Sequence, residues 1–146
     1  ASACRCTPEQ ITRYVGRVSG PLLDRIDLQV EVSRERDWLD TASSRPAEPT
    51  ATVRARALAA RDRQLARQGK PNGALRVAEL AQAAALAPAE TDFLARAFRH
   101  FNLNPRSYHR VLKVARTIAD LAAAPAIEVP HLAEALRLRR LVVAVH

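Results

Sequence analysis

The sequence predicts a mainly α-helical protein, in which a helical bundle follows a truncated piece of an α/β domain. Three observations support this fold class. The 146 residues are rich in alanine, leucine and arginine, which are strong helix formers. From residue 52 onward, prolines, asparagines and glycines stand where helices start and stop. Only residues 26–32 show a clear alternation of apolar and polar side chains, as a strand does.

The N-terminal part combines a helix start with one strand pattern. Thr7 can cap a helix and Gln10 can complete its capping box, so we expect a helix that ends at about residue 15 or 18. A helical turn at 21–25 and the strand at 26–32 follow. Because one strand is not a sheet, its partners must come from an upstream segment or another chain. We therefore expect the chain to be a piece of a longer protein.

Residues 33–51 are polar and contain two prolines, which predicts a linker. The expected domains are thus a core remnant at 1–32, the linker at 33–51 and a helical domain at 52–146. Within the last, caps and breakers predict five helices, at 52–68, 76–85, 88 to about 100, 105 to about 121, and 130 to about 140. The apolar tail at 141–145 fits either a strand or the end of the last helix.

The helix expected from residue 105 is the predicted core element. Apolar residues recur at helical spacing along one face, from Tyr108 to Ala122. We expect this face to pack in the core together with the phenylalanines of the preceding helix. The other face carries polar residues and is expected to lie outside the core: Arg106, His109, Arg110, Lys113, Arg116 and Asp120.

The formal net charge is +8, from 23 basic and 15 acidic residues, which is compatible with nucleic-acid binding. An arginine-rich background from GC-rich coding gives the same charge, since only two of the basic residues are lysines. The helix at 52–68 concentrates arginines, at 54, 56, 61, 63 and 67. It can follow a phosphate backbone or form a solvated face. We favour the solvated face, because the aromatic residues that stack on bases are nearly absent.

Several classes of protein are excluded by what the sequence lacks. The four glycines are too scattered for a phosphate-binding loop, and no nucleophile and base can be paired. We therefore do not expect this chain alone to hydrolyse ATP. No run approaches the roughly 18 apolar residues of a membrane helix, and no secretory leader opens the chain. We expect a soluble, cytoplasmic protein with no membrane partner.

The stretch Ser19-Gly20-Pro21-Leu22-Leu23-Asp24-Arg25-Ile26-Asp27 carries the most information about function. It places one arginine between two carboxylates, just before the strand pattern. A guanidinium is always charged and rigid, so it suits the stabilisation of phosphate charge in a transition state. The alternative is a structural ion pair with Asp24 or Asp27.

This element resembles the Pro-Leu-Leu-Asp-Arg segment of magnesium chelatase-like AAA+ ATPases. Further stretches resemble the ComM/YifB branch of that family, at 4–14, 61–72, 106–121 and 131–136. The resemblance covers nearly the whole chain except residues 33–51, and the matching motifs follow one another in the same order as in the family. The resemblance implies the C-terminal portion of such an ATPase, with the finger helix, the last strand of the core, a linker and a helical AAA+ lid domain.

The resemblance also implies roles for two arginines. Arg25 is the catalytic arginine finger, which acts in trans on the ATP of a neighbouring subunit. Arg106 is the sensor-2 residue, which contacts the nucleotide of its own subunit in cis. A cation in the first turn of a helix gains nothing from the helix dipole, which favours a ligand; a solvated surface arginine is the alternative. The chain departs from the family in having Asn104-Pro105 where Ser-Ala is usual, although asparagine still caps.

For the parent protein, the resemblance implies ATP and Mg²⁺ bound between subunits of a homo-oligomer, a hexamer. It implies a DNA helicase that drives branch migration during natural transformation. The partners are then the upstream AAA+ core and DNA, and we expect no cofactor bound to this chain alone. Cys4 and Cys6 would be half of a four-cysteine zinc site, or simply two reduced thiols. The rival interpretation is a stand-alone basic helical module that binds nucleic acid or another protein.

Overall fold

The computed structural model describes residues 6–23, 25–30, 32, 47–101 and 103–139. Within these ranges the chain is helical and contains no strand, which confirms the mainly α fold class. None of the helices in the described ranges is long and apolar enough to cross a membrane. The elements are α1 (Pro8–Val15), α2 (Gly20–Leu23), α3 (Thr50–Gln68), the 3-10 helix η1 (Asn72–Ala74), α4 (Val77–Ala83), α5 (Pro88–His100), α6 (Pro105–Leu121) and α7 (Val129–Arg137).

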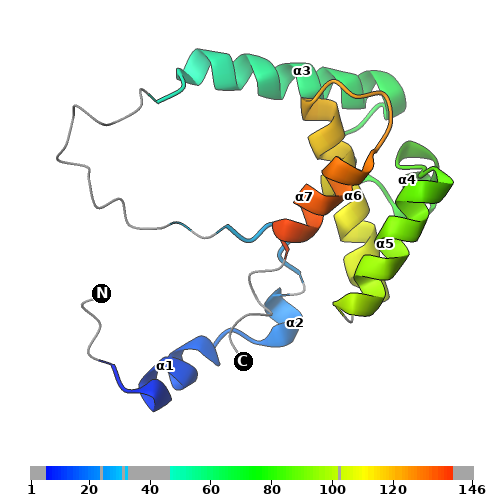
Figure 1. The fold of residues 1–146 in the computed structure, drawn as a ribbon. Coiled ribbons are helices and arrows are strands. Elements are labelled where there is room, and N and C mark those ends of the chain that lie inside the picture. The colour runs from blue at the N-terminus through cyan, green and yellow to red at the C-terminus, as the bar shows by residue number, and fades with distance from the viewer. Residues whose placement is uncertain (1–5, 24, 31, 33–46, 102, 140–146) are drawn as a thin grey trace.

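Helix α6 is the centre of the bundle. It contacts α3, η1, α4 and α7, while α5 packs against α7. Figure 1 shows α3 lying across one end of α6, with α7 alongside α6 and the α4–α5 pair on the other side. The N-terminal half of α3 projects beyond the bundle, and its residues 50–59 are all exposed. The bundle therefore holds α3 only by its C-terminal half.

The core forms on the apolar face of α6, as the sequence predicts. Val111 is 1% exposed, and Ala115 and Ala119 are completely buried. Small residues at these positions allow neighbouring helices to approach α6 closely. Leucines from α4, α5 and α7 complete the cluster. Tyr108 lies at its edge, where its ring meets Phe98 edge to face at a centroid distance of 5.5 Å.

The helix ends follow the capping residues read from the sequence. Thr7 and Gln10 form the expected capping box of α1, and the Asn104 side chain accepts a hydrogen bond from Ser107 N at 2.9 Å at the start of α6. Gly69 ends α3 with φ 70°, a left-handed conformation that glycine adopts without steric cost. Helix α3 begins two residues earlier than expected, directly after Pro49.

The expected strand at 26–32 does not form in the part of it that is described, residues 26–30 and 32. A strand requires a neighbouring strand for its backbone groups, and none is present in the described part of the chain. Instead, Gln29 N donates to the carbonyl oxygen of Leu138, beyond the end of α7, at 2.7 Å. The tail at 141–145 and linker residues 33–46 lie outside the described residues.

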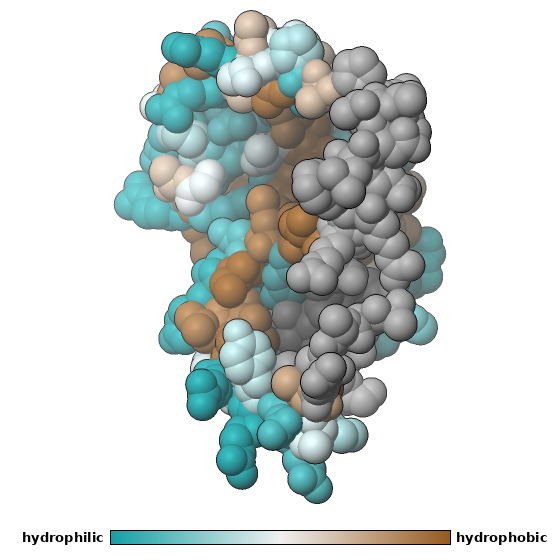
Figure 2. Space-filling model, turned by 90° about the vertical axis from the view of Figure 1, so that its left-hand side faces the viewer, coloured by the Kyte–Doolittle hydropathy of each residue, from teal (hydrophilic) through white to brown (hydrophobic). Residues whose placement is uncertain are grey.

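The N-terminal part of the chain exposes apolar side chains. Tyr14 is 74% exposed, Leu28 50% and Val30 68%. Figure 2 shows hydrophobic residues gathered around the middle of one face, with mostly hydrophilic residues at its lower end. Contiguous apolar surface of this kind is typical of faces that pack against another domain or subunit.

Candidate functional site

Arg25 lies just after α2, and its side chain is exposed. Its Nη1 donates to the backbone carbonyl of Pro21 at 2.9 Å, so the guanidinium folds back over the preceding helical turn. The alternative ion pair with Asp27 is not formed between these described residues, and the Asp27 carboxylate pairs instead with Arg110 of α6. Asp24, the other candidate partner, lies outside the described residues.

The segment that carries Arg25 is attached to the helical bundle. Arg110 Nη1 donates to the carbonyl oxygen of Arg25 at 2.7 Å, in addition to its ion pair with Asp27. Arg139, just past α7, donates from Nη1 to the carbonyl oxygen of Ile26 at 3.3 Å. The segment that carries Arg25 is thus in contact with the first part of α6 and with the residues just after α7.

Arg106 is the second residue of α6 and is exposed. No hydrogen bond or ion pair engages its side chain in the part of the chain that the structure describes. It lies one helical turn before Arg110, on the same face of α6. Since Arg110 binds the Arg25 carbonyl, both arginines predicted to contact nucleotide lie near the N-terminal end of α6.

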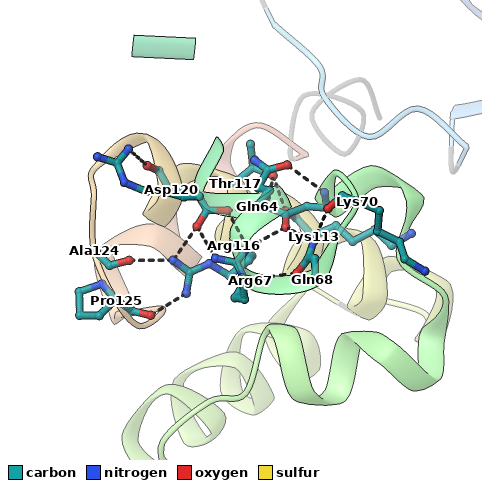
Figure 3. A network of polar contacts seen from close by, with 12 residues as sticks. Gln64, Arg67, Gln68, Lys70, Lys113, Arg116, Thr117, Asp120, Ala124 and Pro125 are labelled. Carbon is teal, nitrogen blue, oxygen red and sulfur yellow. Dashed lines mark hydrogen bonds and ion pairs between the residues drawn. The ribbon is translucent and has the colours of Figure 1, made fainter. Parts of the chain in front are cut away.

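A buried ionic network, which the sequence pattern does not predict, lies toward the other end of α6. Arg116 and Asp120 were expected outside the core but are only 3% and 1% exposed. Asp120 accepts two hydrogen bonds from Arg67, at 2.7 and 2.9 Å, and pairs with Arg116 Nη2 at 3.0 Å (Figure 3). Burial of these charges is tolerated because each has an opposite charge and further hydrogen bonds.

Asn72 extends the network into the loop after α3. It is 1% exposed, and its Nδ2 donates to Asp120 Oδ2 at 2.8 Å and to Thr117 Oγ1 at 3.0 Å. Its backbone N–H donates to Gln64 Oε1 at 2.9 Å, and its Oδ1 accepts from Arg67 Nη2 at 2.9 Å. The two sequence motifs at 61–72 and 106–121 therefore meet at one polar cluster.

The pKa shifts in this network follow from burial and pairing. Burial by itself raises the pKa of Asp120, but hydrogen bonds from Arg67 and Asn72 and the charge of Arg116 outweigh it, so this pKa lies below its ordinary value. Burial lowers the pKa of Arg116, which Asp120 partly offsets, and the guanidinium stays charged. An ionised cluster in which opposite charges are paired in this way fixes helices relative to one another rather than performing chemistry.

Arg116 also secures the loop between α6 and α7. Its Nη2 donates to the carbonyl oxygen of Ala124 at 2.8 Å, and its Nη1 donates to that of Pro125 at 3.1 Å. The i, i+4 spacing of two opposite charges on the polar face of the helix was the only sequence signal for this role. Surface pairs have the same spacing, so this signal does not separate a buried pair from an exposed one.

The arginines of α3 are largely engaged within the molecule. Arg56 forms an exposed bidentate pair with Glu48, at 2.9 and 3.2 Å. Arg63 Nη1 donates to the backbone carbonyl of Asp120 at 3.0 Å, and Arg67 belongs to the network. Three of the five arginines of this helix therefore have partners inside the chain. This arrangement supports a structural and solvated role for the basic helix.

The half zinc site remains a prediction. Cys6 is exposed and carries a free thiol, while Cys4 lies outside the described residues. Over the described ranges, no three histidine, cysteine, aspartate or glutamate side chains come together as a metal would require.

Two known protein families match different parts of the chain. The family described as magnesium chelatase, subunit ChlI C-terminal, matches residues 47–139, and magnesium chelatase, subunit ChlI, matches residues 1–38. The first range covers α3 to α7, which is the whole helical bundle.

Curated relatives agree with this match. The chain is 43% identical to competence protein ComM of Haemophilus influenzae over 139 residues and 42% identical to the uncharacterized protein YifB of Escherichia coli over 135 residues. An uncharacterized protein of Mycobacterium bovis is 33% identical over 147 residues. These alignments cover 92 to 94% of this chain but only 27 or 28% of each relative.

The helical bundle and the family match over most of the chain lead to the same assignment. The resemblance expected from the Pro-Leu-Leu-Asp-Arg element and from the motifs in α3, α6 and α7 is confirmed. The chain belongs to the magnesium chelatase ChlI C-terminal family and is homologous to ComM and YifB.

Proposed function

We propose that this chain is the lid and arginine-finger portion of a magnesium chelatase-like AAA+ ATPase that works as a homo-hexameric ring in the cytoplasm. The observation that carries the proposal is Arg106, an exposed cation in the first turn of α6 with no partner among the described residues. The helix dipole disfavours a cation at this end, so the side chain is better explained by an anionic ligand than by stability.

Two arginines of this chain would act on ATP from different subunits. Arg106 contacts the phosphates of the nucleotide bound to its own subunit. Arg25 contacts the phosphoryl group that is transferred in the neighbouring subunit, where a rigid guanidinium stabilises the developing charge. ATP supplies the phosphoryl group when bound, and Mg²⁺ neutralises its charge. We assign the Mg²⁺ ligands to the upstream core of the same protein, since the described residues contain no cluster of three metal-binding side chains.

We further propose that the ring acts on DNA as a helicase of the ComM type, which drives branch migration. The similarity to the Haemophilus competence protein, at 43% identity, supports this assignment. The net charge of +8 is compatible with it. A stand-alone nucleic-acid module has less support, because three of the five arginines of α3 have partners inside the chain.

The test uses the full-length protein. Arg25→Ala should lower ATP turnover roughly a thousand-fold or more, as loss of an arginine finger does, and leave ATP affinity unchanged. Arg106→Ala should weaken ATP binding by the same subunit. Arg54→Ala, which removes an exposed arginine of α3, is the matched control and should behave as wild type. Unchanged turnover in Arg25→Ala shows that the finger assignment is wrong.

A further inference from the structure

We propose that Arg110 is a positioning residue, which ties the arginine-finger segment to the lid so that Arg25 moves with α6. The assignment of Arg25 as the finger rests on the proposed function. The tie itself rests only on the contacts between residues 25–29 and the bundle, and these can be measured separately.

The first contact is made to the finger residue itself. Arg110 Nη1 donates to the Arg25 carbonyl oxygen at 2.7 Å and also pairs with the Asp27 carboxylate. The Arg110 side chain is 26% exposed, so water only partly competes for these bonds. Because the bond is made to the backbone of Arg25, it fixes the point from which the finger side chain projects.

Two more contacts hold the residues that follow. Arg139 Nη1 donates to the Ile26 carbonyl oxygen at 3.3 Å, and its Nη2 donates to Ser107 Oγ in the first turn of α6 at 3.0 Å. Gln29 N donates to the Leu138 carbonyl oxygen at 2.7 Å. The finger segment is therefore bound at three successive points, one from α6 and two from the residues after α7.

Arg110 lies on the same helix as Arg106, so the tie links Arg106 to the segment that carries Arg25. Arg106 lies four residues earlier, about 6 Å along the helix axis at the usual rise per residue. A packed helix moves as one body, so a displacement of Arg106 by nucleotide is passed to Arg110 and to the backbone of Arg25. The geometry thus couples the nucleotide state of one subunit to the placement of the finger that it offers to its neighbour.

Hydrogen exchange of the Gln29 amide measures the tie in this chain without reference to ATP. Arg110→Ala should raise the exchange rate several-fold, because the segment loses its attachment to α6, and Arg110→Lys should raise it less. The matched control is Lys113→Ala on the same helix, whose Nζ instead bonds to the Gly73 carbonyl at 3.1 Å. If Arg110→Ala leaves the Gln29 exchange rate unchanged, the tie does not exist and the inference fails.

Turnover by the full-length protein measures whether the tie positions the finger. Arg110→Ala should lower kcat roughly ten- to hundred-fold, the cost of a small misplacement of a catalytic group, with little change in the KM for ATP. Arg110→Lys should recover part of this loss. The double variant Arg25→Ala, Arg110→Ala should be no slower than Arg25→Ala, because Arg110 acts through Arg25.

The outcomes separate the two claims. If Arg25→Ala abolishes turnover but Arg110→Ala does not slow it, the proposed function stands and the inference is wrong. A further loss in the double variant assigns Arg110 a merely structural role, which also overturns the inference. If Arg25→Ala itself turns over normally, the proposed function fails, and the positioning role fails with it.

Discussion

The carboxylate of Asp120 receives two hydrogen bonds from the guanidinium of Arg67, at 2.7 and 2.9 Å, although 53 residues separate the two in sequence. This bidentate pair joins the end of α3 to the end of α6. Charge-assisted bidentate bonds are among the strongest in proteins. Since residues 50–59 of α3 are exposed, this pair is a main point at which the bundle holds its first helix.

The first prediction concerns the charge of Asp120. Asp120→Asn preserves the shape of the side chain but leaves two arginines, one of them buried, without their carboxylate. Breaking a buried pair in this way should lower the free energy of unfolding by about 3–5 kcal/mol. Denaturant unfolding followed by circular dichroism measures this change.

The matched control is the exposed pair between Arg56 and Glu48, whose side chains are 52% and 43% exposed. Arg56→Ala should change the free energy of unfolding by about 0.5 kcal/mol or less, because exposed pairs contribute little. Equal effects of the two substitutions would show that the Asp120 network does not stabilise the fold.

The second prediction concerns the pH dependence of stability. The hydrogen bond from Lys70, followed by the bond from the Arg76 backbone, lowers the pKa of Glu79 to about 2 from the ordinary 4.5. A carboxylate whose pKa is lower in the folded state binds fewer protons there than in the unfolded state. Its stabilisation is therefore complete above pH 4.5 and is lost as the pH falls through about 2. The pKa of Asp120 is also lowered, so its contribution to stability is likewise lost as the pH falls below its ordinary pKa of 3.8.

Unfolding at several pH values between 7 and 3 checks this sign. The free energy of unfolding should be nearly constant at the upper end and fall below about pH 4.5, as the lowered carboxyl pKa values require. Glu79→Gln should make the fall shallower without removing it, since Asp120 remains. Stability that rises on acidification would contradict the assignment of both carboxylates.

The third prediction concerns two left-handed residues at helix ends. Ala123 has φ 58°, and its neighbour Ala124 donates back to the Ala119 carbonyl oxygen at 2.9 Å, as in a Schellman motif. Alanine is strained in this conformation, whereas glycine is not. Ala123→Gly should therefore raise the free energy of unfolding. The greater chain entropy of glycine in the unfolded state offsets part of the relieved strain, which leaves a net gain of about 0.5–1 kcal/mol.

The reverse substitution at Gly69 is the control. This residue has φ 70°, and a Cβ added there would meet no atom within 4 Å, so only backbone strain is tested. Gly69→Ala should lower the free energy of unfolding by about 1 kcal/mol. If both substitutions shift stability in the same direction, backbone strain is not the cause.

Much of the fold could be predicted because helix boundaries are local. Thr7, Asn104 and Gly69 mark ends that depend on hydrogen bonds within a few residues, and each acts as the sequence indicates. The strand expected at 26–32 does not form in the described residues 26–30 and 32, because an alternating pattern specifies a face but supplies no partner strand.

The candidate site was only partly predictable for a related reason. Arg116 and Asp120 are charged, as residues on a solvated helix face usually are. Their burial depends on Arg67 and Asn72, which come from α3 and the loop after it. Pairing over such a sequence distance leaves no periodic signal in either segment. Likewise, nothing in the sequence pattern around Arg110 indicates that it binds the backbone at Arg25.

Subunit mixing tests the central claim that Arg25 serves a neighbouring subunit. Full-length Arg25→Ala subunits are combined with full-length subunits whose upstream phosphate-binding loop is inactivated, and each preparation alone should be inactive. In mixed rings, an Arg25→Ala subunit keeps its own phosphate-binding loop and receives Arg25 from its neighbour, so ATP turnover should reappear. If every mixing ratio stays as inactive as the separate preparations, Arg25 does not complete a neighbour's site and the account is contradicted.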